Sequence, residues 1–327
     1  MPLKPPAHLP PPRLDAVTFG ETMVMFRAED NGPLSQVDRY TRALAGAEVN
    51  VAIGLSRLGH ATAWAGRVGD DPLGAHVVSA LSGEGIDTGA VEVDAHAPTG
   101  FQLKGRADVG DPEVVYFRAH SAGSRLASSP AATARLAGAR HLHVTGIPPA
   151  LSPTAREFTY EAMETARAAG LTISFDPNLR PALSPDRDEM VQVVGDLAAR
   201  ADWVLPGLGE GRLLTGRDDA EGIACHYLAA GARRVVVKDG GHGATRLFED
   251  DGCWVQPLFS VRSVDSVGTG DGFAAGLISA RLDRLDAPQA LRRATAVGAL
   301  ATTRRGDSDG LPTRAELEEF LDAHVAA

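Results

Sequence analysis

The chain has 327 residues, of which 44% are hydrophobic, and its formal net charge is -10. This length and apolar content predict one large or two modest α/β domains with an ample core. The acidic balance argues against nucleic acid or an anionic membrane as the main partner, and no apolar run is long enough to span a bilayer. The two cysteines, Cys225 and Cys253, lie far apart without metal-ligand spacing. We therefore expect a cytoplasmic protein without a structural disulfide.

The N-terminal half combines buried strands, helices and a second group of strands. Residues 1–12 are rich in proline and predict a disordered tail, so we expect the folded domain to cover residues 13–325. Periodicity predicts strands over 16–20, 23–28 and 40–44, a helix from about 47 to 58, a strand over 61–67 and a helix ending near 84. Strands over 100–106 and 114–118 can join the segment 21–44 in a small sheet apart from the main one.

The C-terminal half shows a regular alternation of strands and helices. Strands are predicted over 141–145, 172–176, 203–206 and 235–238, and helices over 130–138, 154–169, 187–200, 210–215 and 219–230. A hairpin of 245–248 with 253–256 and helices over 271–284, 288–303 and 314–325 complete the chain. This alternation predicts a parallel sheet with helices on both faces. Polar clusters at 176–180, 207–210 and 238–243 follow strands, so we expect them to share one ligand crevice.

One stretch, Asp265 to Gly276, carries the strongest chemical signal. Gly268 and Gly270 allow the backbone to bend tightly and to approach a ligand, and a helix is predicted from Gly270 onward. Free amides at a helix N-terminus attract anions, and Asp271 places a carboxylate beside them. An anion hole with an adjacent base suits phosphoryl transfer to a hydroxyl. The alternative is purely structural, with Asp271 as a helix cap and the glycines as a turn.

Other sites of known chemistry are missing from the sequence. No Gly-Lys-Ser/Thr of a P-loop and no Gly-x-Ser-x-Gly nucleophile turn occurs. No strict Gly-x-Gly-x-x-Gly opens a helix, which argues against a nicotinamide-dependent oxidoreductase. His141 and His143 share one face of a predicted strand, but without a third ligand we expect packing or a hydrogen bond rather than a metal site.

Two separate motifs resemble the ribokinase (phosphofructokinase-B type) family of carbohydrate kinases. The first is the C-terminal Asp-Ser-x-Gly-x-Gly-Asp-x-Phe-x-x-Gly string. The second comprises Gly46–Ala52, Leu58–Gly59 and Gly66–Gly74, and the resemblance extends over about residues 14–325. It implies a ribokinase-like three-layer α/β/α core with a mainly parallel sheet, and a small β-sheet lid formed by about 21–44 and 99–120. It also implies ATP and Mg²⁺ as cofactors.

Within the family the chain is most similar to 2-keto-3-deoxygluconate kinases. The matching strings are Tyr116–Arg118 with Ser121–Ser124, His143–Ile147 with Ala150–Pro153, Asp176-x-Asn178-x-Arg180, and Arg305–Asp307. This resemblance implies transfer of the γ-phosphoryl group of ATP to the 6-hydroxyl of 2-keto-3-deoxygluconate. Arginine forks suit the carboxylate of such a sugar acid.

The resemblance also implies a role for each matching residue. Asp271 is the base of an in-line attack, and the amides of Gly268, Thr269 and Gly270 hold the charge that develops. Substrate contacts are expected at Gly46, Ala47, Glu48, Asn50, Gln102, Tyr116, Arg118 and Asp307, and at Arg180, which binds either the substrate or the transferring phosphate. Nucleotide contacts are expected at Asn178, Gly207, Lys238, Gly240, Gly241, Gly243 and Thr295, and Glu210 is the candidate for Mg²⁺ through the ATP phosphates.

Three positions depart from the family pattern. Thr269 replaces a smaller residue, Gly207 replaces the asparagine of Asn-x-x-Glu, and Gln102 stands where close relatives have an aromatic residue. The substrate therefore stays open between a 2-keto-3-deoxy acid and the sugars of fructokinase, ribokinase or 5-keto-2-deoxygluconate kinase. A sugar-binding regulator that has lost catalysis is a further alternative. The C4 epimer and a monovalent-cation requirement also stay open, and we expect a homo-oligomer that pairs through the lid.

Overall fold

The structure is a computed structural model that describes residues 14–106, 112–184, 186–249 and 252–324. The tail expected over residues 1–12 lies outside these ranges. In the part of the chain that is described, no helix is long and apolar enough to cross a membrane.

A nine-stranded sheet forms the middle layer, in the order β13-β12-β11-β10-β9-β8-β1-β4-β5. The strands are β1 (Ala16–Gly20), β4 (Thr62–Gly69), β5 (Asp87–Asp94), β8 (His141–Thr145), β9 (Thr172–Asp176), β10 (Trp203–Val204), β11 (Arg234–Asp239), β12 (Ala244–Glu249) and β13 (Gly252–Pro257). Pairing is parallel from β5 to β11, and the pairs β11–β12 and β12–β13 are antiparallel. Every residue of β1 and β8 is buried, as expected for central strands covered on both faces.

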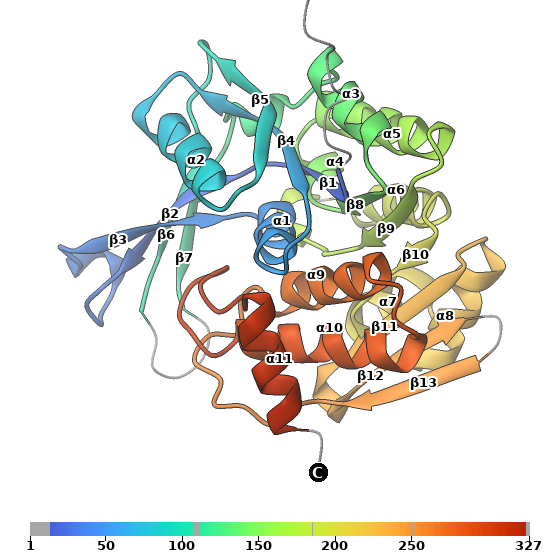
Figure 1. Ribbon diagram of the computed structural model, residues 1–327. Helices are drawn as coiled ribbons and strands as arrows, with labels where there is room; N and C mark the ends of the chain where they lie inside the picture. The colour runs from blue at the N-terminus through green and yellow to red at the C-terminus, as the bar shows by residue number, and fades with distance from the viewer. Residues whose placement is uncertain (1–13, 107–111, 185, 250–251, 325–327) are drawn as a thin grey trace, which may run out of the picture.

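Helices cover both faces of this sheet (Figure 1). On one face lie α1 (Ala47–Arg57), α9 (Thr269–Leu282) and α10 (Ala287–Ala301), and α9 packs against both of the others. Alternate residues of β1 face opposite layers, because Val17 and Phe19 join one core cluster and Ala16 joins the other. The remaining helices are α2 (Pro72–Gly83), α3 (Pro130–Gly138), α4 (Pro148–Leu151), α5 (Pro153–Ala168), α6 (Arg187–Ala198), α7 (Leu208–Thr215), α8 (Ala220–Ala229) and α11 (Arg314–Ala323). The predicted three-layer α/β/α core is therefore confirmed.

A second sheet of four strands stands apart from the main one (Figure 1). Its order is β3-β2-β6-β7, with β2 (Met23–Ala28), β3 (Tyr40–Ala45), β6 (Phe101–Lys104) and β7 (Val114–Phe117). The pair β2–β6 is parallel and the other two pairs are antiparallel. The expected small sheet from these segments is confirmed.

Within the described residues, one strand and one α-helix were not predicted. The strand β5 is half-exposed at the edge of the main sheet, and its polar, glycine-containing sequence gives no strong strand signal. The short helix α4 begins with two prolines, Pro148 and Pro149, which fit the first turn of a helix. The strand β10 is shorter than predicted, because only Trp203 and Val204 pair with both neighbours.

Candidate active site

A cavity of about 420 Å³ lies where the carboxyl ends of the central strands meet the small sheet. Its lining draws on segments that are far apart in the sequence, as expected for a ligand crevice of a parallel sheet. The expected site residues that line it are Gly46, Ala47, Glu48, Asn50, Gln102, Tyr116, Arg118, Asn178, Arg180, Glu210, Lys238, Gly268, Thr269, Gly270, Asp271 and Asp307.

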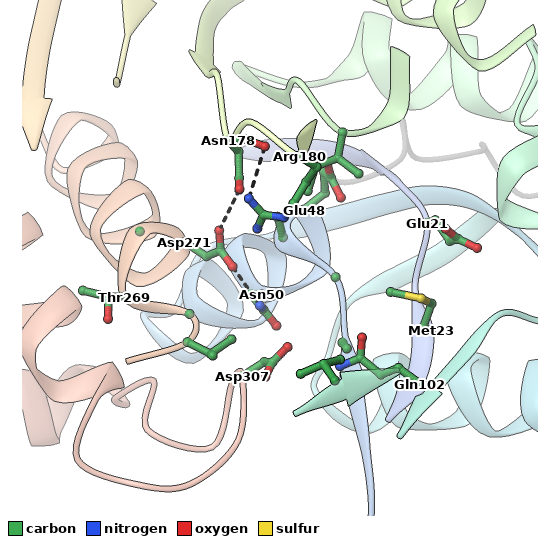
Figure 2. Close-up of a pocket in the computed structure, with 18 of the residues that line it drawn as sticks. Glu21, Met23, Glu48, Asn50, Gln102, Asn178, Arg180, Thr269, Asp271 and Asp307 are labelled. Atoms are coloured by element: carbon green, nitrogen blue, oxygen red, sulfur yellow. Dashed lines mark hydrogen bonds between the residues drawn. The ribbon is translucent and has the colours of Figure 1, made fainter. Parts of the chain in front are cut away.

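Asp271 lies in the first turn of α9, and two amide side chains hold its carboxylate (Figure 2). Asn50 Nδ2 donates to Oδ2 at 2.8 Å, and Asn178 Nδ2 donates to Oδ1 at 3.4 Å. Burial raises the pKa of Asp271 to about 8, which the charges of Asp176 and Glu48 reinforce, although the Asn50 hydrogen bond and Lys238 oppose it. A carboxyl group with a pKa near neutrality is suited to general base catalysis.

The start of α9 has the backbone geometry expected of an anion site. The N-cap Gly268 has a φ of 81°, and a Cβ there would lie 2.1 Å from the carbonyl oxygen of Asp307, so a glycine is required. Gly272 donates the first intrahelical bond, to Gly268 O at 2.8 Å. The amide of Gly270 precedes it and belongs to the donors that a helix cannot satisfy internally, and the amide of Thr269 makes only a long bond, to Ser266 O at 3.4 Å. These amides and the helix dipole favour a phosphate group.

Lys238 supplies a positive charge on the same side of the cavity. It lies at the end of β11, and its Nζ is 2.5 Å from Oδ2 of Asp176 at the end of β9. Burial alone lowers the pKa of Lys238, but Asp176 and Glu210 outweigh it, and the pKa is raised. The lysine therefore stays charged in a place where phosphate oxygens would need compensation.

Glu48, in the first turn of α1, is buried at the base of the cavity. Its carboxylate accepts a hydrogen bond from the Thr145 hydroxyl at the end of β8. Burial raises the pKa of Glu48 to about 7, although Thr145 and the guanidinium groups of Arg118 and Arg180 act in the opposite direction.

The fork of Arg118 is already occupied by a carboxylate of the same chain. Its Nε donates to Oε2 of Glu21 at 2.8 Å, and Glu21, only 3% exposed, also accepts from the Ser121 hydroxyl. Arg118 thus reaches the cavity as half of an ion pair. Tyr116, on β7, is exposed at the cavity mouth, and Gln102 on β6 is buried in its wall.

Arg180 has a different environment from Arg118. Its described hydrogen bonds go to the carbonyl oxygens of Asn178, at 3.3 Å, and Leu179, at 3.0 Å, rather than to a carboxylate. Figure 2 shows its guanidinium group directed into the cavity between Asn178 and Glu48. Arg180 can therefore offer a charged fork to an anionic ligand.

Several expected nucleotide residues do not line this cavity. Gly240 and Gly241 are exposed in a short 3₁₀ turn after β11, Gly243 follows them with a φ of 73°, and Gly207 precedes α7. Thr295 is buried within α10, where its hydroxyl bonds Thr245 and Leu291 O. These residues lie outside this cavity, so their expected contacts to the nucleotide stay predictions.

Glu210 lines the cavity, but both of its carboxylate oxygens accept backbone amides. Oε1 accepts from Leu179 N and Oε2 from Gly207 N, each at 2.8 Å. Among the described residues, no group of three His, Cys, Asp or Glu side chains is arranged to hold a metal ion. This donor set fits Mg²⁺ that arrives with phosphate oxygens and keeps several of its waters, rather than a protein cage.

Sequence reasoning missed Lys104 and Glu21 as residues of the site. Lys104 Nζ lies 2.8 Å from Asp265 Oδ2 and 3.1 Å from Asp307 Oδ1, and all three side chains are largely buried. A signal existed for Lys104, because it follows Gln102 by two residues in a strand and shares its face. Glu21 offered none, because its partner Arg118 is distant in the sequence.

His141 and His143 form a hydrogen-bonded pair around Ser174 rather than a metal site. Each ring has one nitrogen 2.8 Å from the Ser174 hydroxyl. Burial lowers the pKa of each histidine to about 3, so both are neutral at physiological pH. The expectation of a local hydrogen bond is confirmed.

Comparison with known proteins agrees with this geometry. A family model described as "pfkB family carbohydrate kinase" matches residues 13–314. A 2-dehydro-3-deoxygluconokinase of Bacillus subtilis (strain 168) is 49% identical over 317 residues, with 95% of this chain and 96% of the relative covered. A PfkB protein from Polaromonas sp. JS666 superposes with a TM-score of 0.86 at 45% identity, covering 93% of this chain and 99% of that one.

A putative ribokinase II from E. coli, solved in complex with ATP and Mg²⁺, superposes with a TM-score of 0.88 at 27% identity. The alignment covers 95% of this chain and 100% of that one. The family match over most of the chain, the close relative and the shared fold lead to one conclusion: the chain belongs to the pfkB family of carbohydrate kinases and is an ATP-dependent sugar kinase.

Proposed function

We propose that the protein transfers the γ-phosphoryl group of ATP to the 6-hydroxyl of 2-keto-3-deoxygluconate. One observation carries the chemistry: the partly buried carboxylate of Asp271 faces the cavity beside the N-terminal amides of α9. The substrate is supported by the Bacillus subtilis relative, a 2-dehydro-3-deoxygluconokinase that is 49% identical to this chain. The intact carboxylate and anion site argue against a regulator that has lost catalysis.

Asp271 acts as the base in this proposal. Its carboxylate takes the proton of the attacking hydroxyl as the new phosphorus–oxygen bond forms in line with the bond that breaks. Asn50 and Asn178 fix the orientation of the carboxylate. Since the pKa of Asp271 is about 8, the group is deprotonated in only a fraction of molecules at pH 7, and activity rises with pH.

The amides of Gly268, Thr269 and Gly270 stabilise the charge on the transferring phosphoryl group. They are fixed by the helix, so they need no reorganisation as charge develops. Lys238 adds a cation on the same side and is held in place by Asp176. Mg²⁺, when bound with ATP, neutralises further phosphate charge, and Glu210 orders the Leu179 and Gly207 amides nearby.

The sugar binds between α1 and the small sheet. Gly46, Ala47, Glu48 and Asn50 contact its hydroxyls, with Gln102, Tyr116 and Asp307 around them; all seven line the cavity. Arg180 is the best candidate to bind the carboxylate of the acid, since no described carboxylate of the chain holds its fork. Arg118 assists from its ion pair with Glu21.

One observation favours a second candidate, a kinase of a neutral ketose such as fructose. The fork of Arg118 is bound by Glu21, which leaves Arg180 as the main arginine for the acid group and Arg118 in an assisting role. A neutral sugar has no carboxylate, so it needs neither arginine as a partner. The two candidates share Asp271 and the anion site, so they differ only in what Arg180 does.

Further parts of the proposal concern the surroundings of the site. Gly207, Gly240, Gly241, Gly243 and Thr295 contact the nucleotide beyond the cavity. Residues 21–44 and 99–120 act as a lid that excludes water from a kinase domain covering residues 13–325. The protein works in the cytoplasm as a homo-oligomer.

The experiment that tests this proposal measures ADP release from MgATP with five sugars. These are 2-keto-3-deoxygluconate, its galactonate epimer, 5-keto-2-deoxygluconate, fructose and ribose, each with and without added K⁺. Preference for a 2-keto-3-deoxy acid supports the proposal and identifies the epimer, and preference for fructose supports the second candidate. The absence of turnover with all five contradicts both.

A further inference from the structure

We propose that Lys104 is a positioning residue that couples the small sheet to the anion site of α9; this rests on the proposed phosphoryl transfer. Lys104 ends β6, and its side chain is 3% exposed. Its Nζ contacts two carboxylates of the main domain, Asp265 Oδ2 at 2.8 Å and Asp307 Oδ1 at 3.1 Å. These two pairs join a strand of the small sheet to loops that are 161 and 203 positions away.

Asp265 shapes the loop that leads into α9. Its Oδ1 accepts from Val267 N at 3.1 Å, and its Oδ2 accepts from Gly306 N at 3.3 Å as well as from Lys104. The backbone amides of Val264 and Asp265 are also anchored, since both donate to Thr302 O. Asp265 therefore ties the phosphate-side loop to residues 302–306, and Lys104 holds the same carboxylate from the other side.

Asp307 shapes the other wall of the anion site. Its carbonyl oxygen lies against Gly268, where even a Cβ atom would come within 2.1 Å. A shift of Asp307 would therefore move the N-cap of α9 and the amides that follow it. The carboxylate of Asp307 also lines the cavity. Lys104 thus contacts both of the segments that frame Gly268.

The charges explain why a cation is needed at this point. Asp265 and Asp307 each have a side-chain exposure of 9%, and both lie within hydrogen-bonding distance of the same ammonium group. Two buried carboxylates this close repel each other strongly unless a cation lies between them. Lys104 draws the loops of Asp265 and Asp307 together. When the small sheet is displaced, Lys104 moves with it and the two loops lose this cation. Closure of the small sheet therefore also orders the backbone of the anion site.

A second link between the same two parts of the molecule provides a matched comparison. Arg27, on β2 of the small sheet, lies 3.5 Å from Asp309 and donates to the carbonyl oxygen of Arg305. It reaches the loop after α10 but contacts neither Asp265 nor Asp307 in the described interactions. Loss of Arg27 weakens the attachment of the small sheet without removing the cation between the two carboxylates.

The test compares Lys104→Met, Lys104→Met with Asp265→Asn, and Arg27→Met in the full-length protein. In Lys104→Met we expect kcat to fall by about 10–100-fold, because small displacements of groups that position the reaction have effects of this size. The KM values for ATP and sugar change less than about threefold, because a positioning residue acts on the transition state. Arg27→Met changes kcat less than about threefold.

The double variant separates positioning from stability. It removes one of the two facing carboxylates, so it recovers thermal stability relative to Lys104→Met and folds even if the single variant does not. We expect its kcat to stay at least about tenfold below wild type, because the tether from β6 is still missing. Recovery of kcat together with stability overturns the proposal, and so does a loss confined to the KM for sugar, which indicates direct substrate binding.

Hydrogen exchange provides a readout that needs no turnover. We expect the amides of 266–272 to exchange at least about tenfold faster in Lys104→Met than in wild type or Arg27→Met. Unchanged exchange in this segment overturns the coupling. If wild type turns over none of the five sugars but the exchange result holds, the proposed function fails while the coupling by Lys104 stands.

Discussion

Asn50 Nδ2 donates a hydrogen bond of 2.8 Å to Asp271 Oδ2, joining two residues that are 221 positions apart in the chain. This contact connects the first turn of α1 with the first turn of α9. It brings a residue of the N-terminal motif onto the carboxylate of the C-terminal motif. The candidate site exists because these two helices pack side by side on one face of the sheet.

Asp271→Asn should separate catalysis from helix capping. Asparagine keeps the size of the side chain and can still accept from Asn50, but it cannot take a proton. We expect kcat to fall by about 10²–10⁴-fold, with ATP affinity and melting temperature close to those of wild type. Steady-state rates and nucleotide titration measure this. Turnover within threefold of wild type contradicts the role of Asp271 as the base.

Asn50→Leu should shift the pH dependence of the reaction. The Asn50 hydrogen bond lowers the pKa of Asp271, so its removal raises that pKa. The acid limb of kcat/KM therefore moves to higher pH, by about one unit or more if the bond contributes as hydrogen bonds to charged groups do. Asn178→Leu is the matched control, because its bond to Asp271 is longer, at 3.4 Å, and a smaller shift is expected. If kcat/KM depends on pH in the same way in wild type, Asn50→Leu and Asn178→Leu, Asp271 does not titrate in catalysis.

Arg180→Leu should weaken the binding of a sugar acid. Loss of a charge-assisted hydrogen bond costs about 1.5–3 kcal/mol, which corresponds to an increase in KM of about 10–100-fold. The KM for ATP should change little, and activity toward a neutral ketose should be spared. If Arg180 binds the transferring phosphate instead, kcat falls with every sugar alike.

Arg118→Leu should act mainly on stability. The substitution leaves the buried Glu21 carboxylate without its arginine, and breaking a buried pair in this way typically costs about 3–5 kcal/mol. Glu21→Gln combined with Arg118→Leu should recover much of this loss in denaturant unfolding. If Arg118 also assists the acid group, the double variant binds the sugar acid more weakly and ATP as tightly as wild type.

His143→Gln should reveal the pH dependence caused by the buried histidine pair. The folded-state pKa of His143 is lowered to about 3 by burial, so the unfolded chain takes up a proton below about pH 6.5 that the folded protein excludes. Wild type loses stability from this group as the pH falls from about 6.5 toward 3, by up to about 1.4 kcal/mol per pH unit. The variant lacks this loss, so its deficit relative to wild type should shrink on acidification. Urea unfolding between pH 7.5 and about 5 measures the difference, and a deficit independent of pH contradicts it.

Most helices and strands could be predicted because their signals are local. The strand β8 and the helix α3 have the predicted bounds. A continuous apolar run predicts a buried strand and helical spacing predicts a helix, and both patterns can be read from consecutive residues. The edge strand β5 could not be predicted in this way, because its half-exposed polar sequence becomes a strand only by pairing with β4. Strand formation depends on such partners more than helix formation does.

Residue types and spacing by themselves determined the fold class, the glycine turn at the start of α9 and the carboxylate beside it. Glycine geometry and helix dipoles act within a few residues, so a short motif contains them. Tertiary structure alone decided which charged side chains are paired within the protein and which can bind a ligand. Glu21, 97 positions from Arg118, occupies the fork that the sequence assigned to substrate, and Lys104 finds its two carboxylates in distant loops. Charge pairing depends on distance in space and on burial, and neither is a property of neighbours in the chain.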